Sequence, residues 1–151
     1  MRRLVALTIG ASFGALAALG TIASATPGES YRMGETATIP TLNYNGAPTT
    51  VTEITASDWE CSFEQDSCTA WIQFEHRGTQ DTDPSTISYH LSYADGTQIA
   101  AISEPDVGDL YDGRRVGGIV SFPFTDKSSV AGALVLRGEA SGNVLGKWVL
   151  P

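Results

Sequence analysis

The sequence has few of the residues from which catalytic and metal sites are built. It contains two cysteines and two histidines, and the cysteines are not in a CxxC arrangement. A zinc site needs three or four histidine, cysteine or carboxylate ligands, and no GxSxG motif accompanies either histidine. We therefore expect no cofactor, no bound metal and no enzymatic activity.

Basic residues are also scarce, with nine Lys and Arg against seventeen Asp and Glu and a net charge of −8. Beyond residue 25 they are scattered, and Arg114-Arg115 is the only adjacent pair. Nucleic acids and anionic lipids are bound by clustered Lys and Arg. The charge therefore argues against both classes of partner and favours solubility.

Long apolar runs are missing except at the N-terminus, where residues 1–25 read MRRLVALTIGASFGALAALGTIASA. A basic start, an apolar run and a closing Ala-Ser-Ala are typical of a secretory signal peptide cleaved after Ala25. An uncleaved membrane helix and, through Arg2-Arg3, a twin-arginine signal are the alternatives; we favour cleavage and the general secretory route. The sequence thus predicts a secreted, extracellular protein with no membrane span in its mature form.

The rest of the chain contains no stretch of apolar residues with helical spacing and caps. Short Thr-, Val-, Ile- and aromatic-rich runs alternate instead with turn residues, as in a two-sheet sandwich. We expect a leader over 26–34 and one β-sandwich domain over 35–151. The expected strands are Glu35–Tyr44, Thr49–Ala56, Thr69–His76, Ile87–Tyr93, Thr97–Ile102, Val116–Phe124, Val130–Arg137 and Val144–Leu150.

Two turns and one glycine pair refine this prediction. Asn45-Gly46 separates the first two strands, and Asp95-Gly96 suits a tight hairpin turn. Gly117-Gly118, inside a strand, indicates a bulge or a close approach of another group to the backbone. Cys61 and Cys68 are expected to form one disulfide that staples a hairpin or loop.

Aromatic residues are the main candidates for a binding surface. Trp71 and Trp148 fall in strands and are expected in the core, whereas Trp59 and Tyr111 lie in loop-like stretches. Exposed aromatic side chains commonly anchor interfaces. We therefore take Trp59 and Tyr111 as the candidate binding surface.

Acidic residues cluster most densely over residues 104–113. Glu104, Asp106, Asp109 and Asp112 could supply oxygens to calcium, but their spacing is not that of an EF-hand, and a solvated connection is the favoured interpretation. Paired carboxylates could also run glycoside hydrolysis. The acids available for that alternative lie in expected loops, at Glu60, Glu64, Asp66, Asp81 and Asp83.

The histidines offer little for nucleophilic catalysis, which needs a histidine base and an orienting acid. His90 is expected on the wet face of its strand, between Ser88 and Ser92. His76 is expected at a strand end, beside Glu75.

Several motifs, in order, resemble the mycobacterial immunoprotective extracellular antigen family of small secreted actinobacterial proteins. They lie mainly within residues 69 to 151: Trp71, Arg77-Gly78, Asp83-Pro84-Ser85, Tyr93-Ala94-Asp95-Gly96, the run 116–122, Trp148 and Pro151. The resemblance implies an immunoglobulin-like sandwich, secretion and host-immune recognition, and carries over no catalytic residue. The Cys61 and Cys68 pair departs from the family pattern.

These observations together predict a secreted, non-catalytic protein that binds a host or cell-envelope protein. The alternative is a cell-envelope carbohydrate or small-ligand module. That alternative requires an aromatic strip with converging polar groups on one sheet or at one loop end.

Overall fold

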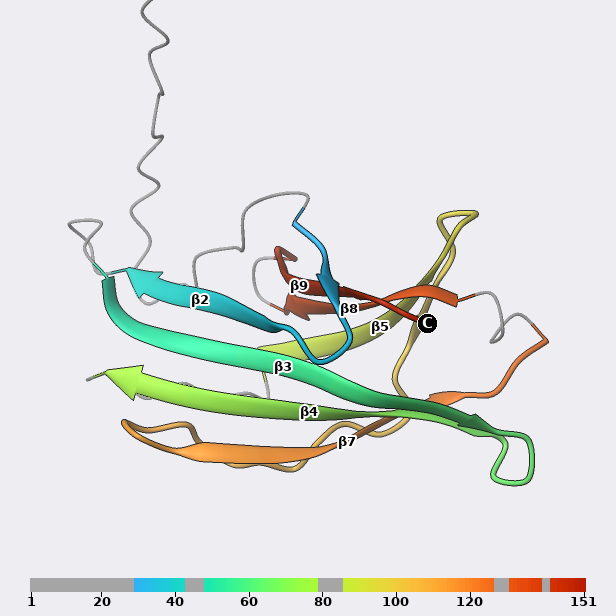
Figure 1. The fold of residues 1–151 in the computed structure, drawn as a ribbon, viewed down its shortest axis with the longest axis horizontal. Helices are drawn as coiled ribbons and strands as arrows, with labels where there is room; N and C mark the ends of the chain where they lie inside the picture. Colours follow the sequence, from blue (N-terminus) through green and yellow to red (C-terminus); the bar gives the residue numbers. More distant parts are fainter. Residues whose placement is uncertain (1–28, 43–47, 79–85, 127–130, 140–141) are drawn as a thin grey trace, which may run out of the picture.

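Two β-sheets packed face to face make up the computed structural model of the chain (Figure 1). The structure describes residues 29–42, 48–78, 86–126, 131–139 and 142–151. No α-helix occurs in these ranges, so the predicted two-sheet, all-β sandwich is confirmed. The strands are β1 (Tyr31–Arg32), β2 (Thr36–Leu42), β3 (Pro48–Ser62), β4 (Ser67–Gly78), β5 (Ile87–Tyr93), β6 (Gln98–Ala100), β7 (Arg115–Pro123), β8 (Ala131–Gly138) and β9 (Val144–Val149).

The larger sheet has the order β1-β9-β8-β5-β6, and the smaller sheet has the order β2-β3-β4-β7. Neighbouring strands are antiparallel except β1 and β9, which run parallel, with Tyr31 opposite Trp148 and Arg32 opposite Val149. Tyr31 and Arg32 fall within the leader expected over 26–34. The expectation of a leader is therefore wrong for these two residues, which form a strand. A strand of two residues is too short to be recognised from alternation in the sequence.

Strand β3 is much longer than the expected Thr49–Ala56 and runs past a β-bulge between Ser57 and Glu60. Asp58 takes a positive φ of 55° there. The bulge shifts the alternation of the strand. Consequently Trp59 turns toward Phe122 of the core, with ring centroids 6.3 Å apart.

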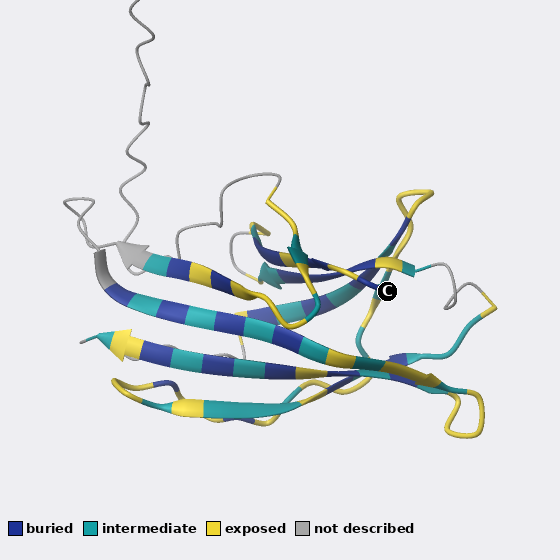
Figure 2. Cartoon of the chain, in the orientation of Figure 1, coloured by how far each residue is buried: buried dark blue, intermediate teal, exposed yellow. Residues whose placement is uncertain are grey.

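The core lies between the sheets, and alternate residues of strands such as β4 and β5 are buried in it (Figure 2). Trp148 is its largest fully buried side chain, as expected, and its Nε1 donates to the carbonyl of Glu35 at 2.8 Å. A Cβ on Gly146 would come within 2.3 Å of the indole. The ring is therefore fixed by a hydrogen bond to the link between β1 and β2 and by the missing side chain beneath it.

The segment between β6 and β7 lies against the inner side of β7. Ser103 forms a bridge with Ser121, and Val107 and Leu110 are buried. Pro105 takes the place that a Cβ on Gly118 would occupy. This segment therefore covers part of one edge of the smaller sheet.

Several expectations lie outside the described residues: the signal peptide over 1–25 with its cleavage site, the leader over 26–28, and the turns at Asn45-Gly46 and 83–85. Within the described ranges, no helix is long and apolar enough to cross a membrane.

Candidate functional site

The outer face of the four-stranded sheet exposes Trp71 near its middle. Alternation along β4 turns Ala70 and Ile72 into the core and Trp71 outward. In the register of the sheet Trp71 lies between Ser57 of β3 and Ile119 of β7. Trp71 is 38% exposed and Ile119 is 54% exposed, so the face carries an apolar patch. The expectation that Trp71 packs in the core is wrong.

Gly117 determines how the indole of Trp71 lies on this face. It is opposite Gln73, the next outward residue of β4. A Cβ at Gly117 would come within 2.6 Å of Cζ2 and 2.9 Å of Nε1 of Trp71. The ring therefore lies over the bare backbone of β7. The close approach expected at Gly117-Gly118 is confirmed, with Trp71 on one side of the strand and Pro105 on the other.

Beyond the indole, the same face carries polar side chains in two cross-strand rows. Gln73 lies in the first row, and the second row contains Glu53, Glu75 and Arg115. With its amide oxygen turned toward Arg115, Gln73 accepts hydrogen bonds from Nε and Nη2 at 3.1 and 3.0 Å. An indole, an amide and a guanidinium thus lie next to one another on an open sheet surface.

Arg77 compensates the two carboxylates that face each other in this row. Its Nη2 lies 2.6 Å from Glu75 Oε1 and 4.0 Å from Glu53 Oε2. The hydrogen bond from Arg77 is the main reason that the pKa of Glu75 lies below its ordinary value, and the charges of Arg77 and Arg115 act in the same direction. Glu75 is therefore an ionised hydrogen-bond acceptor at neutral pH, not a general acid.

We call Trp71, Ile119, Gln73, Glu75 and Arg115 the Trp71 face. It offers a flat apolar ring for stacking and, beside it, both signs of charge. Such a surface suits non-covalent recognition.

The two aromatic residues predicted as a binding surface are far apart in the fold. Trp59 is half-buried against Phe122, since the bulge in β3 turns it inward. Tyr111 is exposed, and its ring lies 5.2 Å from the guanidinium carbon of Arg114. The expected exposure is found for Tyr111 only, and no single patch contains both.

The four acids proposed for calcium are not brought together either. In the described residues no group of three or more His, Cys, Asp or Glu side chains could hold a metal ion. Asp112 Oδ1 accepts from the backbone N–H of Gly78 at 2.8 Å. The guanidinium of Arg114 donates to the carbonyls of Val107 and Asp109, which are the kind of oxygen that calcium would need. The positively charged guanidinium of Arg114 therefore already occupies these carbonyl oxygens.

His76 is fully buried rather than merely placed at a strand end, and its Nδ1 lies 2.9 Å from Thr52 Oγ1. Its backbone also binds the connection to β7, because its N–H donates to the carbonyl of Arg114 and its carbonyl accepts from Gly113. His76 therefore ties β4 to the residues that precede β7. Alternation with the buried Ala70, Ile72 and Phe74 is the signal in the sequence for this burial, because Glu75 and Arg77 lie on the opposite side of the strand.

His90 is half-buried on the outer face of the larger sheet, and its Nε2 lies 3.1 Å from Ser88 Oγ. Burial, and then the charge of Arg137, lower its pKa, so the ring is neutral at pH 7. A serine beside a neutral histidine is two thirds of a triad. Among the described residues, however, no carboxylate accepts from its Nδ1, and the pair is a local contact along one strand.

The acids considered for hydrolysis do not form a pair across a cleft. Glu60, Glu64 and Asp66 are exposed on the β3–β4 hairpin, and residues 81 and 83 lie outside the described ranges. Among the described carboxyl side chains, that of Glu104 is the one with a raised pKa, caused first by burial and then by the charge of Glu139.

The chain was compared with known proteins. No protein-family model matches it, and no curated protein matches its sequence. Among solved structures it is similar to MPT63, a secreted protein from Mycobacterium tuberculosis, with a TM-score of 0.58 and 14% identity over 84% of this chain and 100% of that chain. An ApaG protein from Pseudomonas aeruginosa aligns with a TM-score of 0.41 and 14% identity over 61% of this chain and 98% of that chain. The likeness to MPT63 shows that the chain has the β-sandwich fold of that protein, and unrelated functions share such folds.

Proposed function

We propose that this chain is a secreted, non-catalytic protein that binds a host or cell-envelope protein through the Trp71 face. The observation that carries the proposal is the exposure of the Trp71 side chain on the outer face of a β-sheet. Large aromatic side chains are enriched among the residues that dominate binding energy at protein interfaces. Alternation along β4 places Trp71 on the outer face of the sheet, on the same side as Gln73 and Glu75.

Secretion rests on the N-terminal sequence and is supported by the fold. Residues 1–25 have the composition of a signal peptide. MPT63, whose fold is similar, is described as a secreted protein. We further propose that the chain is a divergent relative of the mycobacterial antigen family to which the motifs over residues 69 to 151 point.

The experiment is an affinity capture with the exported chain as bait, using cell-envelope extract and host-cell surface protein, followed by direct binding of each captured protein. Trp71→Ala should abolish capture, since it removes the ring and leaves the flat backbone of Gly117 exposed. Ile102→Ala is the matched control, because Ile102 is an exposed apolar residue outside the Trp71 face. Proteins captured equally by the parent chain and Trp71→Ala would argue against this face.

One observation favours a second candidate, a carbohydrate-binding module. Gln73, Glu75 and Arg115 place hydrogen-bonding groups beside the Trp71 ring, as stacking on a sugar would need. Titration of the parent chain with soluble cell-wall oligosaccharides, followed by tryptophan fluorescence, tests it. A change in emission that Trp71→Ala and Gln73→Ala both remove would support a carbohydrate ligand over a protein.

A further inference from the structure

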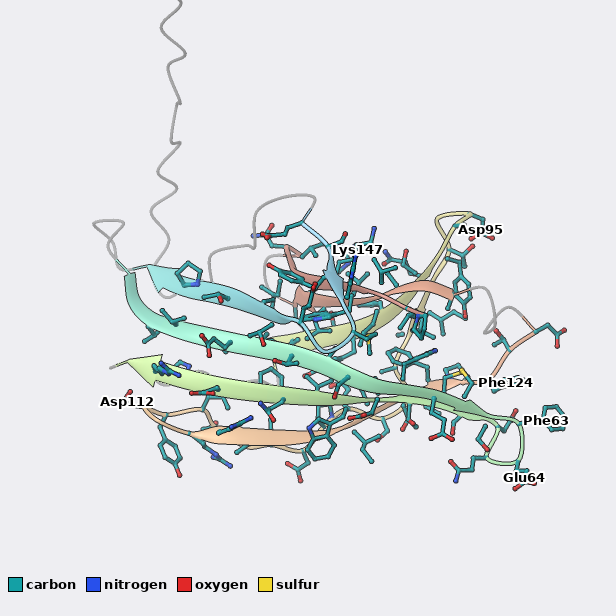
Figure 3. The ribbon with its side chains drawn as sticks, in the orientation of Figure 1. Phe63, Glu64, Asp95, Asp112, Phe124 and Lys147 are labelled. Carbon is teal, nitrogen blue, oxygen red and sulfur yellow. A yellow bond between two sulfur atoms is a disulfide. The ribbon has the colours of Figure 1, made fainter. Side chains whose placement is uncertain are left out.

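At the tip of the β3–β4 hairpin, an exposed phenylalanine contacts a half-buried one from the segment after β7. Phe63 is 83% exposed, the highest value among the large apolar side chains of the described residues. Its ring meets that of Phe124 edge to face, with centroids 5.9 Å apart. Figure 3 shows Phe63, Glu64 and Phe124 at this end of the molecule and Asp112 at the other.

The tip is fixed in place by covalent and hydrogen bonds. The Cys61–Cys68 disulfide joins the two strands directly below it. Asp66, at a positive φ of 52°, donates its N–H to the carbonyl of Phe63 and accepts at its own carbonyl from Phe124 N–H at 3.0 Å. The second bond attaches the segment after β7 to the hairpin. The two rings are therefore positioned before any partner arrives, which reduces the entropy lost on binding.

Among the described residues of the β3–β4 hairpin and of the segment after β7, the charged side chains around the two rings are acidic. Glu60, Glu64, Asp66 and Asp126 are exposed. No Lys or Arg occurs in residues 48–70 or 116–126, and the next basic residue, Lys127, lies outside the described residues. An apolar tip with an acidic rim is complementary to an apolar pocket with a basic rim, and it is repelled by anionic lipid.

We propose that this tip, defined by Phe63, Phe124, Glu60 and Glu64, docks into an apolar pocket rimmed by Lys and Arg on a partner protein. The two phenylalanines fill the pocket, and the carboxylates pair with the basic rim and increase the rate of encounter. The Trp71 face is a separate surface, so the tip is a second point of contact and does not depend on the function proposed above.

The probe is a displayed library of random peptides, panned against the immobilised chain, which is produced by export so that Cys61 and Cys68 are joined. The peptides that enrich are synthesised, and their affinities are measured by fluorescence anisotropy at several salt concentrations. We expect Lys and Arg flanking aliphatic or aromatic residues. Phe63→Ala should weaken their binding by about tenfold or more, as at an interface hot spot. The double variant Glu60→Gln, Glu64→Gln should weaken binding and flatten its salt dependence.

Two controls separate the tip from other surfaces. Val149→Thr changes an exposed apolar residue of the larger sheet, and Trp71→Ala changes the other candidate face; both should bind the peptides like the parent chain. Thermal unfolding of each variant checks that the fold is kept, which the exposure of Phe63 leads us to expect.

The proposal is overturned if the enriched peptides lack basic residues, if none depends on Phe63, or if none enriches. Dimerisation that Phe63→Ala abolishes would assign the tip to a second copy instead. Vesicle binding that Phe63→Ala abolishes would assign it to a membrane. The proposal for the Trp71 face survives each of these results, because its own test depends on Trp71.

Discussion

Three glycines of the sandwich lie where a side chain would enter a neighbouring ring. Gly117 lies beneath Trp71, Gly118 beneath Pro105 and Gly146 beneath Trp148. Each glycine lies within a strand, where this residue weakens the sheet unless another group uses the space. Here the rings of Trp71, Pro105 and Trp148 fill that space, so each ring can pack as it does only because the residue beneath it is glycine.

Gly146→Ala should lower the free energy of unfolding by about 1–3 kcal/mol, as overpacking of a core does. The new methyl group would enter the ring of Trp148, which is fully buried and bonded to Glu35, so the ring has no free space into which to move. Urea denaturation measures the change. Gly117→Ala is the matched control: it crowds Trp71, an exposed ring that can swing into solvent, and should cost less. Equal losses in the two variants would show that the buried ring is not the cause.

Glu104 allows a prediction about pH. Burial and Glu139 raise its pKa in the folded chain above the ordinary value of 4.5, so stability is lost as the pH rises through the folded-state pKa. Glu104→Gln should therefore stabilise the chain at pH 7. The gain should be below about 1 kcal/mol because the group is mostly exposed, and it should vanish below pH 4.5, where both states are protonated. Thermal unfolding at both pH values tests this, and a gain that persists in acid would contradict it.

At the scale of elements, the bulge in β3 explains why Trp59 packs against the core although it was expected at the surface. Without the bulge, strict alternation would turn Ala56 and Asp58 inward and leave Trp59 outside. The positive φ of Asp58 resets the pattern and brings Trp59 to Phe122. Simple periodicity misses such a position, although an Asp within a strand is a signal for it, since Asp tolerates this conformation better than most residues.

Asp58→Gly should preserve the bulge, whereas Asp58→Val should cost about 1–2 kcal/mol, because a β-branched residue resists the left-handed region. Guanidinium denaturation gives the free energies, and near-ultraviolet circular dichroism reports the packing of Trp59. Both variants lose the hydrogen bond from Ser57 to the Asp58 carboxylate, so that loss cancels in the comparison. A valine variant as stable as the glycine variant would rule out the backbone explanation.

Removal of the disulfide should affect only the tip of the β3–β4 hairpin. We expect the double variant Cys61→Ala, Cys68→Ala to lose about 2 kcal/mol, the value for a short closed loop. Amide hydrogen exchange should rise at residues 60–68 and remain slow in the middle of β3 and β4, where the sheet has neighbours on both sides. Mild reduction of the parent chain should reproduce the pattern. Faster exchange throughout the sandwich would mean that the disulfide supports the whole fold.

For the whole molecule, the sequence predicted the architecture better than the site. Alternation in strands such as β5 is a direct consequence of one solvent-exposed and one buried face, so the sandwich and most of its strands could be predicted from the sequence. The outward direction of Trp71 could be predicted from alternation, because Trp71 shares one side of β4 with Gln73 and Glu75; the expectation of core packing rested instead on the general tendency of a sandwich to bury its tryptophans. The composition of the Trp71 face could not be predicted, because it depends on the register with Arg115, Gly117 and Ile119, which only the pairing of β4 and β7 reveals.

The acidic composition predicts a response of the whole molecule to salt. With a net charge of −8 the folded chain repels itself at pH 7, and added ions screen this repulsion. The midpoint of thermal unfolding should therefore rise with sodium chloride at pH 7 and change little near the isoelectric point of about 4.5. Differential scanning calorimetry at both pH values measures it. A midpoint that falls with salt at pH 7 would indicate that specific ion pairs outweigh the general repulsion.

The pairing of β1 with β9 also sets the order in which the molecule can be completed. Tyr31 lies beside Trp148, and the carbonyl of Glu35 binds an indole 113 residues further along the chain. A chain that emerges gradually, from a ribosome or through a membrane pore, therefore holds β1 without its partner until β9 has emerged as well. The edge of the larger sheet that β1 forms is completed only after that point.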